Sequence, residues 1–114
     1  MAITVSTEQK KILQSVIIEN GIVEQSLIYM EELTELGKRI SKAARGKLDK
    51  ENLTEEIADV YNVISQIKMF YGIKDEDIQK RLDYKINRTA TDMKLEAIKR
   101  LEFSKGRRCE NTVY

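Results

Sequence analysis

The chain contains no proline, and this absence constrains its fold more than any other feature of the sequence. Proline breaks a helix interior, and glycine weakens one. The 114 residues include no proline and five glycines, and long segments repeat apolar residues every three or four positions, as amphipathic helices do. The sequence therefore predicts an all-α protein, with one domain over residues 1–103 and a flexible C-terminal tail over residues 104–114.

Four helices are expected, from Ser6 to Asn20, from about Val23 to Ala44, from Asn52 to Gly72 and from Asp75 to about Leu101. The first and third are predicted to start at capping boxes, Ser6 to Gln9 and Asn52 to Glu55. Gly21 and Gly72 follow helix ends, where glycine favours a left-handed cap. The stretch from Asn87 to Thr91 has weaker helix propensity, which predicts a kink or break in the fourth helix.

The apolar rows of the second and third expected helices are the candidate core. Residues three and four apart lie on one face of a helix. The row of the second helix holds Val23, Leu27, Met30, Leu33, Leu36 and Ile40. The row of the third holds Ile57, Val60, Tyr61, Ile64, Ile67 and Phe70 or Tyr71. A domain of this size buries a modest core, so association with further copies would help to stabilise it.

The sequence has no histidine, and this limits the chemistry that the chain can perform. Histidine-based general base catalysis and most zinc sites are excluded, as is the Glu-x-x-His ligation of di-iron helical bundles. Cysteine occurs once, at Cys109. A metal site in this chain must therefore use oxygen ligands, which suit Mg²⁺, Mn²⁺ or Ca²⁺.

Charge and hydropathy argue against two classes of partner. A net charge of +1 at pH 7 gives no general attraction to nucleic acid or to an anionic membrane. The sequence has no run of 18 apolar residues, and its N-terminus has neither the basic nor the apolar region of a secretory signal. We therefore expect no membrane partner. The single cysteine indicates a reducing compartment, so we expect a cytoplasmic protein.

Two pairs of carboxylates border the apolar rows. Glu32 and Glu35 lie in the second expected helix, and Glu56 and Asp59 lie in the third. The members of each pair are three residues apart, so they are neighbours on the helix surface. A positively charged, glycine-containing stretch over residues 42–50 connects the two helices. Carboxylates this close to a core are costly unless they are neutralised, and they raise one another's pKa.

Two interpretations of these carboxylates follow from the residues alone. In the first, they are ordinary solvated helix charges that pair with nearby basic residues, namely Lys38, Arg39 or Lys68. In the second, a divalent cation neutralises them in a site between two antiparallel helices. The position of both pairs beside an apolar row favours the second interpretation more than either pair would alone.

The same motif resembles that of a known family. Glu31-Glu32-x-x-Glu35, a spacer, and Glu56-x-x-Asp59 resemble the signature of the MazG-like, all-α NTP pyrophosphohydrolases. The flanking residues agree, because Gln25 precedes the glutamate pair and Tyr71-Gly72-Ile73 resembles the small single-domain and phage-type members. The similarity covers roughly residues 20–90.

The resemblance implies an Mg²⁺-dependent hydrolase, with Mn²⁺ as a substitute, that cleaves an NTP into NMP and pyrophosphate. It implies a four-helix bundle-like fold that forms a homodimer or homotetramer. The implied metal ligands are Glu32, Glu35, Glu56 and Asp59. Glu31 and Glu35 are the implied catalytic residues, with Glu31 as a further ligand or as the base that orients water.

Four residues are candidates for binding the nucleotide. Lys85 and Arg88 in the fourth helix would bind its phosphates, although a solvated helix face explains them equally well. Asn62 and Gln25 are candidates for contacting the base or the sugar. The chain lacks the tryptophan that some relatives use to stack the base, and its candidate substitutes are Tyr29, Tyr61 and Phe70. Base preference is therefore left open.

Three alternatives to this function differ in class. A non-catalytic helical module would bind a partner, and its stability would not depend on divalent metal. An all-α dUTPase or a phosphoribosyl-ATP pyrophosphatase would share the carboxylate site and differ in its base pocket. A nucleic-acid binder has support only from Lys105-Gly106-Arg107-Arg108 near the C-terminus, so nucleic acid is not an expected partner.

Overall fold

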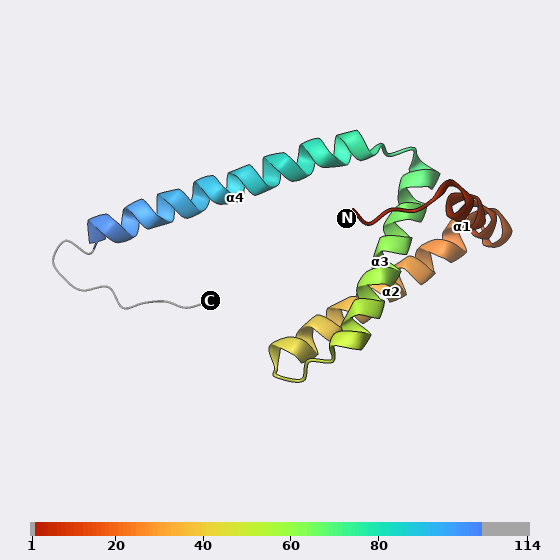
Figure 1. Ribbon diagram of the computed structural model, residues 1–114, viewed down its shortest axis with the longest axis horizontal. Helices are drawn as coiled ribbons and strands as arrows, with labels where there is room; N and C mark the ends of the chain where they lie inside the picture. Colours follow the sequence, from red (N-terminus) through yellow and green to blue (C-terminus); the bar gives the residue numbers. More distant parts are fainter. Residues whose placement is uncertain (1, 104–114) are drawn as a thin grey trace. The chain divides into compact units, whose positions relative to one another are not determined.

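The structure is a computed structural model that describes residues 2–103, and the predicted flexible tail over residues 104–114 lies outside them. The described residues form four helices and no strand: α1 (Thr7–Asn20), α2 (Ile22–Ala44), α3 (Lys50–Tyr71) and α4 (Asp75–Phe103) (Figure 1). The all-α prediction is therefore confirmed. The chain divides into two compact units, the first ending at residue 73 and the second beginning at residue 74. This division does not test the prediction of one domain over residues 1–103, which stays a prediction.

The start of α1 is the predicted capping box. The Ser6 hydroxyl accepts a hydrogen bond from the Gln9 amide at 3.1 Å, and the Gln9 side-chain oxygen accepts one from the Ser6 amide at 2.9 Å. Two free donors of the first turn are thereby satisfied. At the other end, Gly21 caps α1 and directly precedes α2, with φ 80° and ψ 153°. This ψ lies outside the left-handed helical region that was predicted for Gly21. It belongs to a backbone conformation that is adopted almost only by glycine.

The start of α3 differs from the prediction by about one turn. Asp49, not Asn52, is the N-cap: its carboxylate accepts hydrogen bonds from the Asn52 amide at 3.1 Å and from the Asn52 side chain at 2.8 Å. Thr54 lies inside the helix, where its hydroxyl bonds the Lys50 carbonyl. Asp49 prevails because a carboxylate at the cap satisfies free amides and also interacts favourably with the helix dipole. The end of α3 at Gly72 is confirmed, and Gly72 adopts the left-handed conformation.

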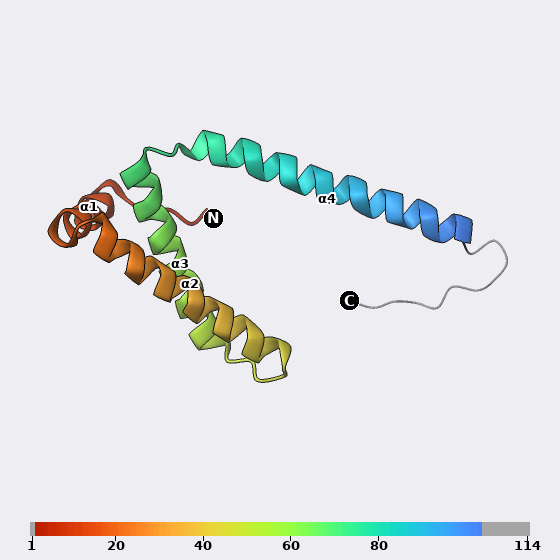
Figure 2. The ribbon, with the colours of Figure 1, turned by 180° about the vertical axis from the view of Figure 1, so that it is seen from behind.

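The first unit is a helical hairpin with a third helix across its open end. The connection between Ala44 and Lys50 is short, so α2 and α3 run antiparallel and side by side (Figures 1 and 2). α1 contacts both of them at the end where α2 begins and α3 finishes. This arrangement brings the middle of α2, with the first carboxylate pair, against the first half of α3, with the second.

The face that α2 turns toward α3 is not the predicted apolar row. The fully buried residues of α2 are Gln25 and Tyr29, and those of α3 are Val63 and Gln66. Most of the predicted rows are exposed instead, namely Val23, Leu27, Met30, Leu33, Ile40, Ile57, Tyr61, Ile64, Phe70 and Tyr71. These rows are therefore not the core of the single chain, because apolar periodicity shows that a face will be covered but does not show which neighbour covers it.

The second unit is described by α4, which runs unbroken over Asp75–Phe103. The predicted break between Asn87 and Thr91 is absent. In this stretch the hydroxyls of Thr89 and Thr91 donate to the carbonyls four residues earlier, both at 3.0 Å, so these residues satisfy their polar groups within the helix. None of the four described helices combines the length and the apolar character that a membrane span requires.

The cap of α3 gives a direct test of these boundaries. We expect Asp49→Ala to lower the free energy of unfolding by about 1 kcal/mol, because the free amides of the first turn lose their acceptor. Thr54→Ala serves as the control, since Thr54 is exposed inside α3 and alanine favours the helix more than threonine. Urea unfolding followed by circular dichroism measures both. A loss for Asp49→Ala no larger than that for Thr54→Ala would contradict Asp49 as the cap of α3.

Candidate metal site

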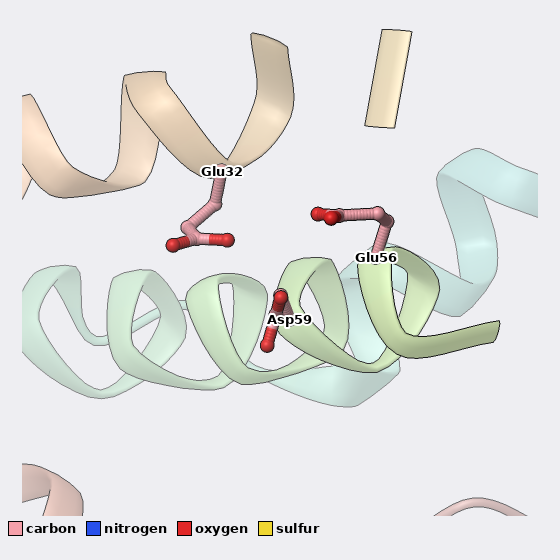
Figure 3. A group of neighbouring side chains, drawn as sticks. All are labelled: Glu32, Glu56 and Asp59. Carbon is pink, nitrogen blue, oxygen red and sulfur yellow. The ribbon is translucent and has the colours of Figure 1, made fainter. Parts of the chain in front are cut away.

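Three carboxylates from two helices meet at the α2–α3 interface. Glu32, Glu56 and Asp59 each offer one oxygen, and these oxygens all lie within 4.8 Å of one another. In Figure 3, Glu32 points from α2 toward α3, and Glu56 points from α3 back toward α2. We call these three residues the carboxylate cluster. The cluster joins one member of the first predicted carboxylate pair, Glu32, to both members of the second.

Helix geometry explains how the cluster forms. Glu56 and Asp59 are three residues apart and therefore neighbours on α3. Gln25, Tyr29 and Glu32 are spaced by four and three residues on α2, so they share the face that lies against α3. The burial of Gln25 and Tyr29 thus sets the direction in which Glu32 points. The first two turns of this face are uncharged, and the third carries the carboxylate.

Burial separates the three members of the cluster. Asp59 is exposed, whereas Glu32 and Glu56 are half-buried. The Oε2 atom of Glu56 is itself buried and has no hydrogen-bond partner. A buried carboxylate oxygen that accepts no hydrogen bond is costly, because it gives up water and receives nothing in exchange. The cluster therefore contains an acceptor that a cation would satisfy.

Burial and neighbouring negative charges both act on Glu32. Its pKa is raised, first by burial, then by the charge and hydrogen bonding of Asp59, and then by the charges of Glu56 and Glu35. Burial disfavours the ionised form, and a neighbouring negative charge disfavours it again. Both effects would be reversed by a divalent cation between the carboxylates. An all-oxygen set of anionic ligands fits the hard cations Mg²⁺, Mn²⁺ and Ca²⁺.

The other two predicted acidic residues lie outside the cluster. Glu35 forms an ion pair with Lys38, with 3.3 Å between its Oε1 and the lysine Nζ. Lys38 is one of the basic partners that the solvated-charge interpretation expected, so this interpretation accounts for Glu35. Glu31 is exposed on α2 beside Glu32. The assignments of Glu31 and Glu35 as catalytic residues, and of Glu35 as a ligand, stay predictions.

The predicted nucleotide-binding residues are found in three different environments. Gln25 is buried, 3% exposed, and hydrogen-bonded to Asn20 and Gln66. Asn62 is exposed, and its Oδ1 accepts a hydrogen bond from Gln66. Lys85 and Arg88 are exposed on α4, in the second unit, where the Arg88 guanidinium lies 5.9 Å from the centre of the Tyr84 ring. All four assignments stay predictions.

Sequence reasoning missed Gln66, which is buried beside the site. Its Oε1 accepts hydrogen bonds from Gln25 at 3.0 Å and Tyr29 at 2.7 Å, and its Nε2 donates to Asn62 at 2.8 Å. With Asn20, which donates to Gln25, these residues form what we call the glutamine network. The sequence carries no signal for its burial, because positions 56, 59, 63 and 66 follow one face of α3 and three of the four are polar, which is typical of a solvated face.

Comparison with known proteins adds no relative to this description. No protein-family model, no curated protein and no solved structure matches the chain. The resemblance of the carboxylate motif to the MazG-like family therefore stays a prediction from the sequence.

The raised pKa of Glu32 predicts a pH-dependent effect of removing its charge. A folded-state pKa above the unfolded value, about 4.3 for glutamate, means that ionised Glu32 opposes folding. This loss of stability is absent below the unfolded pKa and complete once the pH has risen through the folded one. In metal-free protein, Glu32→Gln should therefore raise the free energy of unfolding at pH 7 by about 0.5 kcal/mol or more, and the gain should vanish in acid.

Urea unfolding in a chelator at pH 7 and at pH 4 measures this difference. Glu31→Gln is the matched control, since it removes the same charge from an exposed neighbour outside the cluster. A gain that is equal for both variants, or equal at both pH values, would show that Glu32 does not experience the repulsion described.

Proposed function

We propose that the chain is a divalent-cation-dependent NTP pyrophosphohydrolase, which converts an NTP and water into NMP and pyrophosphate. The observation that carries this proposal is the carboxylate cluster, with three oxygen ligands from two helices and a buried, unpartnered oxygen on Glu56. The doubled-glutamate motif and its resemblance to the MazG-like pyrophosphohydrolases support the same function. The cluster alone supports a cation site, and the motif selects the reaction.

The proposed cofactor is Mg²⁺, with Mn²⁺ as a substitute. Glu32, Glu56 and Asp59 would hold it, and Glu35 is the proposed fourth ligand from the same helix as Glu32. Such an ion, when bound, neutralises phosphate charge and polarises the phosphoryl group. Mg²⁺ is usually held by a few carboxylates together with substrate phosphates, so a cluster with one exposed member, Asp59, suits it.

The remaining chemistry falls to side chains of the chain itself. Glu31 is the proposed base that orients the attacking water, because it is exposed and adjacent to Glu32. Lys85 and Arg88 are the proposed phosphate-binding residues, since phosphoryl transfer depends on cationic groups that stabilise developing charge. Asn62 would use its Nδ2 toward the nucleotide, because its Oδ1 is already occupied by Gln66.

Product analysis with purified protein tests the reaction. We expect each NTP or dNTP that is a substrate to give a nucleoside monophosphate and pyrophosphate, and only with a divalent cation present. Glu56→Gln should lower turnover by about 100-fold or more, because it removes one anionic ligand and its share of the electrostatic stabilisation. Glu55→Gln is the matched control, an exposed neighbour outside the cluster, and should retain wild-type turnover.

Each other outcome points to a specific alternative. A nucleoside diphosphate and phosphate would mean a different hydrolysis at a similar site. Turnover confined to dUTP or to phosphoribosyl-ATP would identify one of the related pyrophosphatases. No turnover with any nucleotide, in folded protein whose stability does not respond to Mg²⁺ or Mn²⁺, would identify a non-catalytic helical module.

We also propose that the chain functions as a homodimer or homotetramer. The described residues bury three apolar side chains, Ile17, Tyr29 and Val63. Twenty-five large apolar residues are exposed in the single chain, among them Leu27 at 58% and Met30 at 63%. Small domains need additional burial to be stable, and large apolar patches on a soluble chain mark association surfaces. A second copy would cover the exposed row of α2.

Light scattering during gel filtration tests this association. We expect a mass of two or four times the 13.2 kDa chain. Leu27→Glu should shift the distribution toward the monomer, because it places a charge on the exposed apolar row of α2. Gln14→Glu adds the same charge to an exposed position on α1 and should leave the mass unchanged. A wild-type mass of 13.2 kDa at micromolar concentration would contradict the proposal.

A further inference from the structure

Half of the fully buried residues at the α2–α3 interface carry a side-chain amide. On these two helices the fully buried residues are Gln25, Tyr29, Val63 and Gln66. Burying two glutamine side chains is costly unless both ends of each amide find partners. Here they do, because Gln66 Oε1 accepts from Gln25 and Tyr29 while Gln66 Nε2 donates to Asn62. The interface therefore contains a satisfied polar network at a position where leucine would be cheaper to bury.

The hydrogen bonds of this network have a fixed direction. Burial raises the pKa of the Tyr29 hydroxyl, which keeps it protonated and able to donate. Gln66 Oε1, 2.7 Å away, is the acceptor of that proton. If the Gln66 amide were turned round, its oxygen would no longer face the Tyr29 hydroxyl, and a buried donor would lose its acceptor at a cost of about 1–3 kcal/mol. Gln66 is thus held in one orientation by both of its α2 partners.

The carboxylate cluster requires a fixed register between α2 and α3. A slip of one helical turn moves a side chain by about 5.4 Å along the helix, which exceeds the 4.8 Å that spans the cluster oxygens. Hydrophobic attraction is non-directional, so apolar contacts oppose such a slip less sharply than directional bonds do. Hydrogen bonds do prevent it, since they weaken steeply with distance and angle. Without a cation, repulsion among the carboxylates also favours separation of the two helices.

The network lies on the same helix faces as the cluster. Tyr29 precedes Glu32 by three residues on α2, and Asn62 follows Asp59 by three residues on α3. Both of the bonds from α2 end on one atom of α3, the Oε1 of Gln66. A shift between the helices would break both at once. Buried polar groups that specify register at some cost in stability are well attested in helical assemblies.

We propose that Gln66 is a positioning residue for the metal site: it fixes the register of α2 against α3 so that Glu32 meets Glu56 and Asp59. Gln66 acts through the helices that carry the ligands and does not touch the ion itself. This inference rests on the proposed function, because it assumes that the cluster binds a divalent cation. A buried residue can contribute to stability or set the geometry of a site, and the role proposed for Gln66 is the second.

The decisive variant replaces the whole polar contact by apolar groups. Gln25→Leu, Tyr29→Phe and Gln66→Leu are combined in one protein, so that no buried partner is left unsatisfied, while Asn20 and Asn62 are exposed and can turn to water. Such an exchange is expected to keep the helices folded and to preserve or raise stability. We expect the affinity for Mn²⁺ alone, without nucleotide, to fall by about 10- to 100-fold.

Titration of the metal-free proteins with Mn²⁺, followed by electron paramagnetic resonance of the free ion, measures this affinity. Urea unfolding of the same samples in chelator measures stability independently. Gln14→Leu is the control for a glutamine-to-leucine change at an exposed position of the same unit, and its affinity should equal that of the wild type. A folded triple variant with wild-type Mn²⁺ affinity would overturn the proposal.

Three further outcomes are also decisive. If the triple variant does not fold, Tyr29→Phe replaces it, since this change removes one hydroxyl and keeps the ring; about threefold weaker Mn²⁺ binding would support the proposal and unchanged binding would overturn it. If the wild type binds no divalent cation, the proposed function fails and the positioning role fails with it. If the wild type binds Mn²⁺ and the variants bind it equally well, the positioning role alone fails.

Discussion

The repulsion among three carboxylate oxygens within 4.8 Å is the constraint to which the α2–α3 interface is adapted. Charges of one sign at this separation repel each other, and in this chain the pKa of Glu32 is raised first by burial and then by this repulsion. The opposing contacts lie on the same interface, where Gln66 accepts two hydrogen bonds from α2. The hydrogen bonds that hold α2 against α3 thus lie one or two helical turns from the carboxylates that repel each other.

Several local features could be predicted from the sequence because each depends on a few adjacent residues. The Ser6 to Gln9 capping box and the helix end at Gly72 are examples, and both are confirmed. The convergence of Glu32 with Glu56 and Asp59 also follows from spacing, once the helices are taken as antiparallel neighbours. The predicted start of α3 differs from the observed one because Asp49 and Asn52 are both good N-caps. The boundary depends on which of the two caps the helix.

The choice of buried face could not be predicted, because it depends on long-range partners. Gln25 and Gln66 are 41 residues apart, and each is a poor candidate for burial until the other is placed beside it. The apolar residue Leu27, by contrast, is a good candidate but has no neighbour to cover it within the described part of the chain. Apolar periodicity depends on the hydrophobicity of each position taken singly. It therefore cannot predict the burial of polar residues that hydrogen-bond to each other across an interface.

The single residue between α1 and α2 has a consequence for how this chain can vary. Gly21 closes one helix and opens the next, so the two helices meet at a single residue with no loop to absorb a change in length. One residue inserted in the last turn of α1 would rotate the preceding part of α1 by about 100° about its axis. Ile17, which packs in the core, would then turn away from it. Related chains with this fold should therefore vary in length within the α2–α3 connection and keep the α1–α2 junction at constant length.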